Sequence, residues 1–112
     1  MAFDETLAER IRKGLARKKG IEEQKTFGGL CIMLNGHMLV GVWNDSMIVR
    51  LGVEQEAEAL LEAHVKRLDI KRKPMKGWIR IAKEGVQEVE QVKAWIQRAV
   101  KFVEKLPAKE KK

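Results

Sequence analysis

Four short β-favouring runs separated by turn residues occupy residues 22–51, and this pattern restricts the fold more than any other feature. The runs cover residues 22–27, 30–34, 37–43 and 46–51. The second and third runs are apolar and are joined by Asn35-Gly36. Both residue types accept the positive φ that a type I′ hairpin turn requires. The region therefore predicts an antiparallel β-meander.

The runs carry apolar residues on both faces of the predicted sheet. Leu30, Ile32 and Leu34 would point to one side, whereas Cys31 and Met33 would point to the other. We expect helices to cover one face and something apolar, such as a partner chain, to cover part of the other. A homodimer is one arrangement that this pattern allows. Cys31 is the single cysteine, and its apolar context predicts a small core residue.

Apolar residues at helical spacing predict three helices, over residues 4–19, 53–68 and 87–106. Asp4 or Thr6 can cap the first helix. The second carries acidic residues early and basic residues late, an order that complements the helix dipole. The third is the longest predicted helix.

The segment "DIKRKPMKGWIRI" at residues 69–81 is interpreted as a basic loop that leads into one added strand. Pro74 breaks any helix that approaches it, and Gly77 precedes the strand expected over residues 78–82. Trp78 would anchor that strand. The sequence predicts an α+β fold in one domain, residues 1–107, followed by a flexible basic tail at residues 108–112.

Composition excludes several classes of protein. Hydrophobic residues make up 45% and charged residues 35% of 112 residues, which suits one globular core and not a disordered chain. No apolar run approaches the roughly 20 residues that span a bilayer, so we expect no membrane association. The N-terminus, "MAFDETLAERIRK", is charged and amphipathic and shows no secretory signal, so the expected location is the cytoplasm.

Residues for catalysis or metal binding are scarce. His37 and His64 are the only histidines, and neither has a second histidine or a cysteine at ligand spacing. Ser46 is the only serine and lies in no nucleophile motif. We therefore expect no catalytic residue, metal ion or cofactor.

The glycine pair in Phe27-Gly28-Gly29 is the nearest approach to a phosphate-binding loop. It lacks the G-x-G-x-x-G pattern and leads into a strand, whereas phosphate binding uses backbone N–H groups at a helix N-terminus. A β-turn or bulge between two strands is the favoured interpretation.

Basic residues are the strongest chemical feature, with a formal net charge of +7 and a pI near 9.7. They form two clusters, at residues 10–25 and 66–83. If both met on one face they could contact a nucleic-acid backbone. A solvated basic surface is favoured over phosphate binding, and Trp43, Trp78 and Trp95 are expected in the core. The candidate contact residues for an anion or a partner are Lys71, Arg72, Lys73, Lys76, Arg80, Arg12, Arg17, Lys18 and Lys19.

The order of three segments resembles one known family. They are "KTFGGLCIMLNGHMLVGV", "MIVRLG" and, after a charged helix, "KPMKGWIRI". In this order they resemble the TfoX N-terminal domain family, which includes the TfoX/Sxy competence regulators of bacteria, over about residues 4–107. The resemblance implies a single α+β domain with a strongly bent antiparallel sheet and flanking helices. It also implies an association with transcriptional activation, together with the cyclic-AMP receptor protein, and no catalytic residues.

Those regulators carry a second, C-terminal domain. This sequence ends at Lys112, directly after the last predicted helix, so we expect a short single-domain member. The leading hypothesis is a non-enzymatic cytoplasmic interaction module, a transcription-associated accessory protein that binds a protein partner. Direct nucleic-acid binding through the basic surface is one alternative. An enzyme with an unrecognised site is the other.

Overall fold

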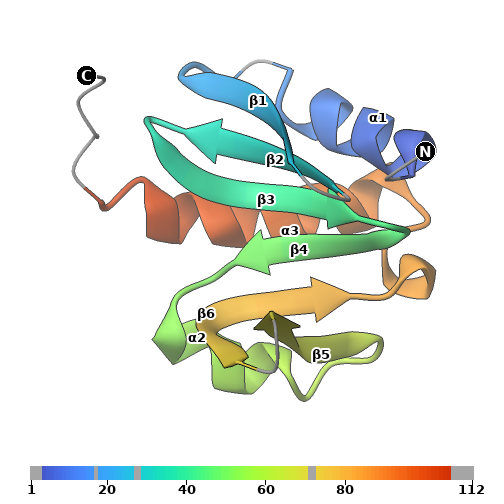
Figure 1. Ribbon diagram of the computed structural model, residues 1–112, viewed down its shortest axis with the longest axis vertical. Helices are drawn as coiled ribbons and strands as arrows, with labels where there is room; N and C mark the ends of the chain where they lie inside the picture. Colours follow the sequence, from blue (N-terminus) through green and yellow to red (C-terminus); the bar gives the residue numbers. More distant parts are fainter. Residues whose placement is uncertain (1–3, 17, 27–28, 71–72, 107–112) are drawn as a thin grey trace.

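The computed structural model of the protein describes residues 4–16, 18–26, 29–70 and 73–106. Figure 1 shows one antiparallel sheet with the long helix α3 behind it. The strands are β1 (Ile21–Thr26), β2 (Gly29–Leu34), β3 (His37–Trp43), β4 (Ser46–Arg50), β5 (Val65–Ile70) and β6 (Lys73–Ile81). The helices are α1 (Glu5–Gly14), α2 (Val53–Ala59), the 3-10 turn η1 (Lys83–Gly85) and α3 (Val89–Val103). The expected α+β fold is confirmed.

Six strands form the sheet in the order β1-β2-β3-β4-β6-β5. The hairpin between β2 and β3 turns at Asn35 and Gly36, whose φ values are 53° and 84°. Both are positive, as a type I′ turn requires, and the predicted meander from β1 to β4 is confirmed. The turn between β1 and β2 involves Phe27 and Gly28, which lie outside the described residues.

Side chains alternate across the meander, so one face of the sheet is buried. Leu30, Val42 and Met47 lie opposite one another in successive strands and are all buried. They belong to one core to which α1 and α3 also contribute, through residues such as Ile11 and Ile96. α1 and α3 pack against each other and against β3. The helices therefore lie on the buried face of the sheet.

The first helix is shorter than its sequence pattern predicts. Asp4 caps it, because its carboxylate accepts hydrogen bonds from the backbone N–H groups of Thr6 and Leu7 at 2.9 and 3.2 Å. The helix ends at Gly14 and not near residue 19. Gly20, with φ of +83°, stands immediately before β1 and turns the chain into the sheet.

The prediction of one long helix over residues 53–68 is wrong. α2 ends at Ala59, and β5 pairs with β6 from Val65 onward. Leu61, an apolar residue within the predicted helix, is 88% exposed. The chain reverses at His64, where φ is 68°. Residues from Val65 onward pair with β6 instead of continuing the helix, because this pairing satisfies the backbone hydrogen-bonding groups along the edge of β6.

The expected loop at residues 69–77 is also mostly strand. β5 continues to Ile70, and β6 begins at Lys73 instead of residue 78. Lys71, Arg72 and the expected tail at residues 108–112 lie outside the described residues. Among the described residues, no helix combines the length and apolar character needed to cross a bilayer.

Candidate interaction surfaces

The face of the sheet that turns away from α1 and α3 is apolar at its centre. Cys31, Gly41, Ile48 and Arg80 lie opposite one another across four strands, one residue out of phase with the buried rows. We call the face defined by these residues, together with Met33, Met38 and Trp43, the helix-free face. Apart from Gly41, all of these residues are only partly buried.

Two tryptophans stand beside cations on or next to this face. The Arg80 guanidinium lies 5.8 Å from the centroid of the Trp43 ring. Arg50, the register partner of Trp78, lies 5.7 Å from that ring. Such distances allow cation–π attraction. Aromatic and basic side chains are therefore interleaved here, a pattern that the sequence alone did not reveal.

The expectation that all three tryptophans belong to the core is partly wrong. Trp95 is in the core, and Trp78 is buried but packs outside the main core cluster. Trp43 is half-buried on the helix-free face. Cys31 is likewise half-buried on this face and is not a core residue. The strand register explains the positions of Trp43 and Cys31. Side chains alternate along a strand, and these two point to the face opposite their buried neighbours Val42 and Leu30.

The candidate contact residues of the second basic cluster lie at the β5–β6 edge. Lys76 is exposed on β6, and Arg80 is half-buried on the same strand. Lys73 begins β6. Lys71 and Arg72 are outside the described residues.

The candidate contact residues of the first cluster lie toward the opposite edge. Arg12 is on α1, while Lys18 and Lys19 follow α1 and precede β1. Arg17 is outside the described residues. Because β1 and β5 form the two edges of the sheet, the described residues of the two basic clusters lie toward opposite edges and do not meet (Figure 1).

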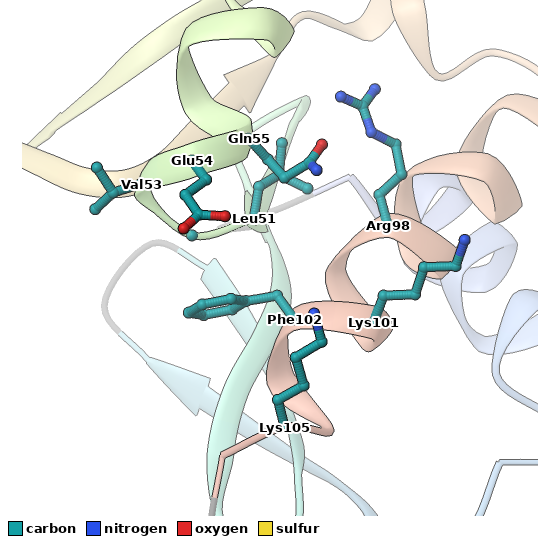
Figure 2. Close-up of a pocket in the computed structure, with 9 residues that line it drawn as sticks. Leu51, Val53, Glu54, Gln55, Arg98, Lys101, Phe102 and Lys105 are labelled. Atoms are coloured by element: carbon teal, nitrogen blue, oxygen red, sulfur yellow. The ribbon is translucent and has the colours of Figure 1, made fainter.

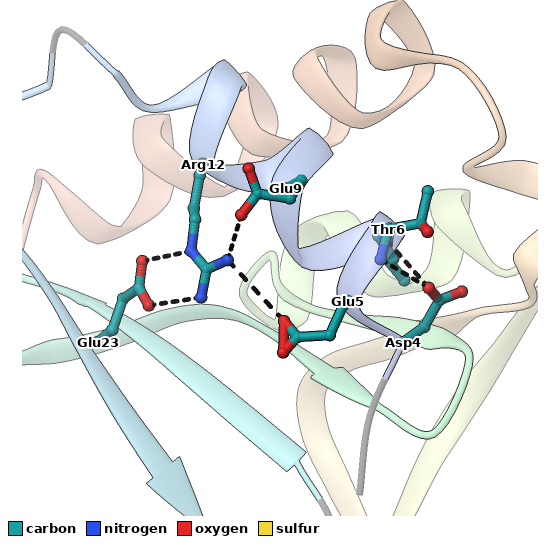
Figure 3. Close-up of polar contacts among 7 residues, drawn as sticks. Asp4, Glu5, Thr6, Glu9, Arg12 and Glu23 are labelled. Carbon is teal, nitrogen blue, oxygen red and sulfur yellow. Dashed lines mark hydrogen bonds and ion pairs between the residues drawn. The ribbon is translucent and has the colours of Figure 1, made fainter. Parts of the chain in front are cut away.

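Folding surrounds Arg12 with acidic side chains, as Figure 3 shows. Its guanidinium donates to both carboxylate oxygens of Glu23, at 2.9 and 3.0 Å, and also to Glu9. Glu5 is 4.0 Å away. Hydrogen bonding to Glu23, and then to Glu9, raises the pKa of Arg12, and the Arg12 hydrogen bond lowers the pKa of Glu23.

Lys18 is paired as well. Its Nζ lies 3.1 Å from a carboxylate oxygen of Glu104, just after α3. Arg12 and Lys18, two of the candidate anion-contact residues, are thus already paired with carboxylates of this chain. Lys19 and Lys76 remain exposed, and neither has an ion-pair partner in the described part of the chain.

A groove of about 630 Å³ separates the start of α2 from the C-terminal half of α3 (Figure 2). It is lined by Leu51, Gly52, Val53, Glu54, Gln55, Arg98, Lys101, Phe102 and Lys105. Phe102 forms an aromatic floor, because its ring packs directly on Gly52. Three of the lining residues are cations and one is a carboxylate, and the guanidinium of Arg50 lies 5.7 Å from the centroid of the Phe102 ring. The sequence shows the spacing of Arg98, Lys101 and Lys105. The opposite wall of the groove, formed by the start of α2, depends on where that helix ends.

No cluster of three or more histidine, cysteine or acidic side chains suited to a metal ion occurs among the described residues. Glu56 is the one charged residue buried in that part of the chain. Its carboxylate accepts the backbone N–H of Gly77 at 3.0 Å and lies 3.5 Å from Arg67. This arrangement ties α2 to the β5–β6 hairpin and is structural.

The fold and these surfaces define a small α+β domain with one helix-covered face and one helix-free face. The TfoX N-terminal domain matches residues 13–103, which is most of the chain. The chain therefore belongs to the TfoX N-terminal domain family, as its sequence segments indicate. Comparisons with curated proteins and with solved structures gave no match.

Proposed function

We propose that the protein is a non-enzymatic regulatory module of the cytoplasm that binds a protein partner through its helix-free face. Membership of the TfoX N-terminal domain family supports a TfoX-like regulatory or competence-related role. The partner would be a component of the transcription apparatus or of its regulation.

The half-exposed apolar centre of the helix-free face carries this proposal. Met33 lies opposite Met38 across the β2–β3 pair, and Ile48 lies on the next strand beside Gly41. Interfaces between proteins are enriched in methionine and aromatic residues at their centre. Methionine also adapts its shape to a partner surface. Trp43 and Arg80 extend the same face with two residue types that often dominate binding energy.

Site-specific photo-crosslinking in the native cell tests the proposal. A photoreactive amino acid at Ile48 should yield a covalent adduct with a different protein, and the same group at exposed Gln97 of α3 should not. Met38→Glu should abolish the adduct, since a buried carboxylate without a partner is costly. An adduct equal to two copies of this chain, or equal adducts from both positions, would contradict the proposal.

Single-stranded nucleic acid is a second candidate partner, favoured by one specific observation. Trp43 and Arg80 stand together on the helix-free face, with Lys66 opposite Arg80 in β5. Bases stack on exposed aromatic rings while cations contact the phosphates. Binding of labelled single strands should weaken steeply with added salt and with Lys66→Glu. No binding of DNA or RNA at low salt would exclude this candidate.

A further inference from the structure

The groove between α2 and α3 has a fixed apolar floor. A Cβ placed on Gly52 would lie 2.6 Å from two atoms of the Phe102 ring, so the ring is packed directly against backbone. Val53, in the adjacent wall, is 65% exposed. An aromatic floor beside an exposed aliphatic side chain is a surface on which an apolar side chain of a ligand can be buried.

The rim of this groove is positively charged. Lys101 lies in the last turn of α3 and Lys105 in the turn that follows the helix, and both line the groove. Both are exposed, and neither has an ion-pair partner in the described residues. Arg98 is different, because its guanidinium lies 2.7 Å from Glu62 and 4.5 Å from the Trp95 ring centroid. The unpaired positive charge comes from the two lysines.

Few acidic groups of the chain itself offset this charge. Glu54 is the only carboxylate that lines the groove among the described residues. Glu104, next to Lys105 in sequence, is engaged by Lys18. Residues 108–112, which follow in the sequence, contain three lysines and one glutamate and have the same sign as the rim. Charge complementarity therefore points to a foreign acidic ligand.

We propose that the groove between α2 and α3 binds an acidic peptide segment of a partner protein, with an apolar side chain seated against Phe102 and Val53 and carboxylates placed at Lys101 and Lys105. The volume of about 630 Å³ lies within the range of about 300–1,000 Å³ typical of ligand clefts. This inference goes beyond the proposed function, since α3 packs on the opposite side of the sheet from the helix-free face.

Fluorescence anisotropy with a labelled peptide of glutamate and leucine tests the groove. We expect saturable binding that is lost when every glutamate is replaced by glutamine or every leucine by serine. The double variant Lys101→Glu/Lys105→Glu should bind at least about tenfold more weakly, because two attractive contacts become repulsive. Val53→Ser should weaken binding about threefold through lost apolar contact.

The matched control is Lys83→Glu/Lys93→Glu, which changes the net charge equally at two exposed lysines outside the groove. At an ionic strength near 0.15 M, where screening acts within about 8 Å, the control should alter affinity less than about twofold. Equal weakening by both double variants, unchanged binding of the glutamine peptide, or no saturable binding would overturn the inference. None of these results affects crosslinking from Ile48, so the two proposals fail separately.

Discussion

Gly77 occupies a position where a side chain meets two obstacles at once. Its φ is +85°, and a Cβ there would lie 3.3 Å from backbone atoms of Gly52 and Val53. Its carbonyl accepts from the N–H groups of Leu51 and Gly52 at 2.8 and 3.0 Å. From the sequence, Gly77 is expected only to precede a strand; its close approach to Gly52 and Val53, just after β4, follows from the pairing of β6 with β4.

Gly77→Ala should therefore lower the free energy of unfolding by about 1–3 kcal/mol through the positive φ and the crowded backbone. Chemical denaturation measures this change. Gly36→Ala is the comparison, because Gly36 shares a positive φ of 84° but lies in a hairpin turn. We expect the smaller loss at Gly36. An equal or greater loss there would show that the contact with Gly52 contributes nothing.

The Arg12–Glu23 pair should make the free energy of unfolding depend on pH in the acidic range. Hydrogen bonding from Arg12 lowers the pKa of Glu23 below its ordinary value of 4.5. A group with a lowered folded pKa contributes stability above the unfolded pKa and loses it as the pH falls through the folded value. Both side chains are about one-third exposed, so solvent screening limits the effect to below about 1 kcal/mol.

Arg12→Gln should accordingly lose less stability than the wild-type protein when the pH falls from 6 to 3. Urea midpoints at the two pH values measure the difference, and Glu54→Gln, at an exposed acid in no ion pair of the described residues, serves as the control. Parallel losses in the wild type and Arg12→Gln would contradict the pairing. Arg12 was predicted as a contact residue from local charge; Glu5 and Glu9 lie on the same helix, and Glu23 of β1 reaches it only in the folded chain.

At the scale of elements, one buried carboxylate helps to hold α2 against the sheet, together with Ala59 in the core. Glu56 accepts the N–H of Gly77 at 3.0 Å and is buried, whereas its ion-pair partner Arg67 is mostly exposed. The hydrogen bond should therefore matter more than the ion pair. A buried N–H group without an acceptor costs about 1–3 kcal/mol.

Glu56→Ala should destabilise the protein by about that amount and speed hydrogen exchange at the Gly77 amide. Glu56→Gln keeps an oxygen acceptor and loses only the charge, so its cost should stay below about 1 kcal/mol. Denaturation and amide exchange on the two variants separate these contributions. If Gln proved as costly as Ala, the ion pair with Arg67 would be the dominant contact.

The elements that local pattern could predict are those with a single consistent periodicity. β2 and β3 alternate around Asn35-Gly36, and α1 and α3 carry uninterrupted apolar stripes. β5 was missed because Val65 and Leu68 fit a continuing helix as well as a strand, and pairing with β6 decides between the two. The groove wall formed by α2 was missed for the same reason, because its position follows from the early end of that helix.

At the scale of the whole molecule, one core joins nearly every element. Buried residues of α1, α2, α3 and strands β2 to β6 belong to a single cluster, and Ile21 of β1 packs against it. A core shared in this way favours cooperative unfolding. Trp43 on the helix-free face and Trp95 on α3 report from opposite sides of the sheet.

In each variant that keeps a single tryptophan, fluorescence and circular dichroism should therefore report the same unfolding midpoint. A chain with only Trp43 and a chain with only Trp95, the others being replaced by phenylalanine, should each show the same urea midpoint by fluorescence and by far-UV circular dichroism. Each variant is compared with itself, so a change in absolute stability does not affect the test.

A fluorescence midpoint for Trp43 below that of the circular dichroism signal would mean that the helix-free face loosens before the core. A partner that binds only the folded form of that face would then stabilise the sheet. Raising the concentration of this partner would raise the Trp43 midpoint before the midpoint of the circular dichroism signal. Coincident midpoints, which we expect from the shared core, mean that a partner meets a face already rigid in the free protein.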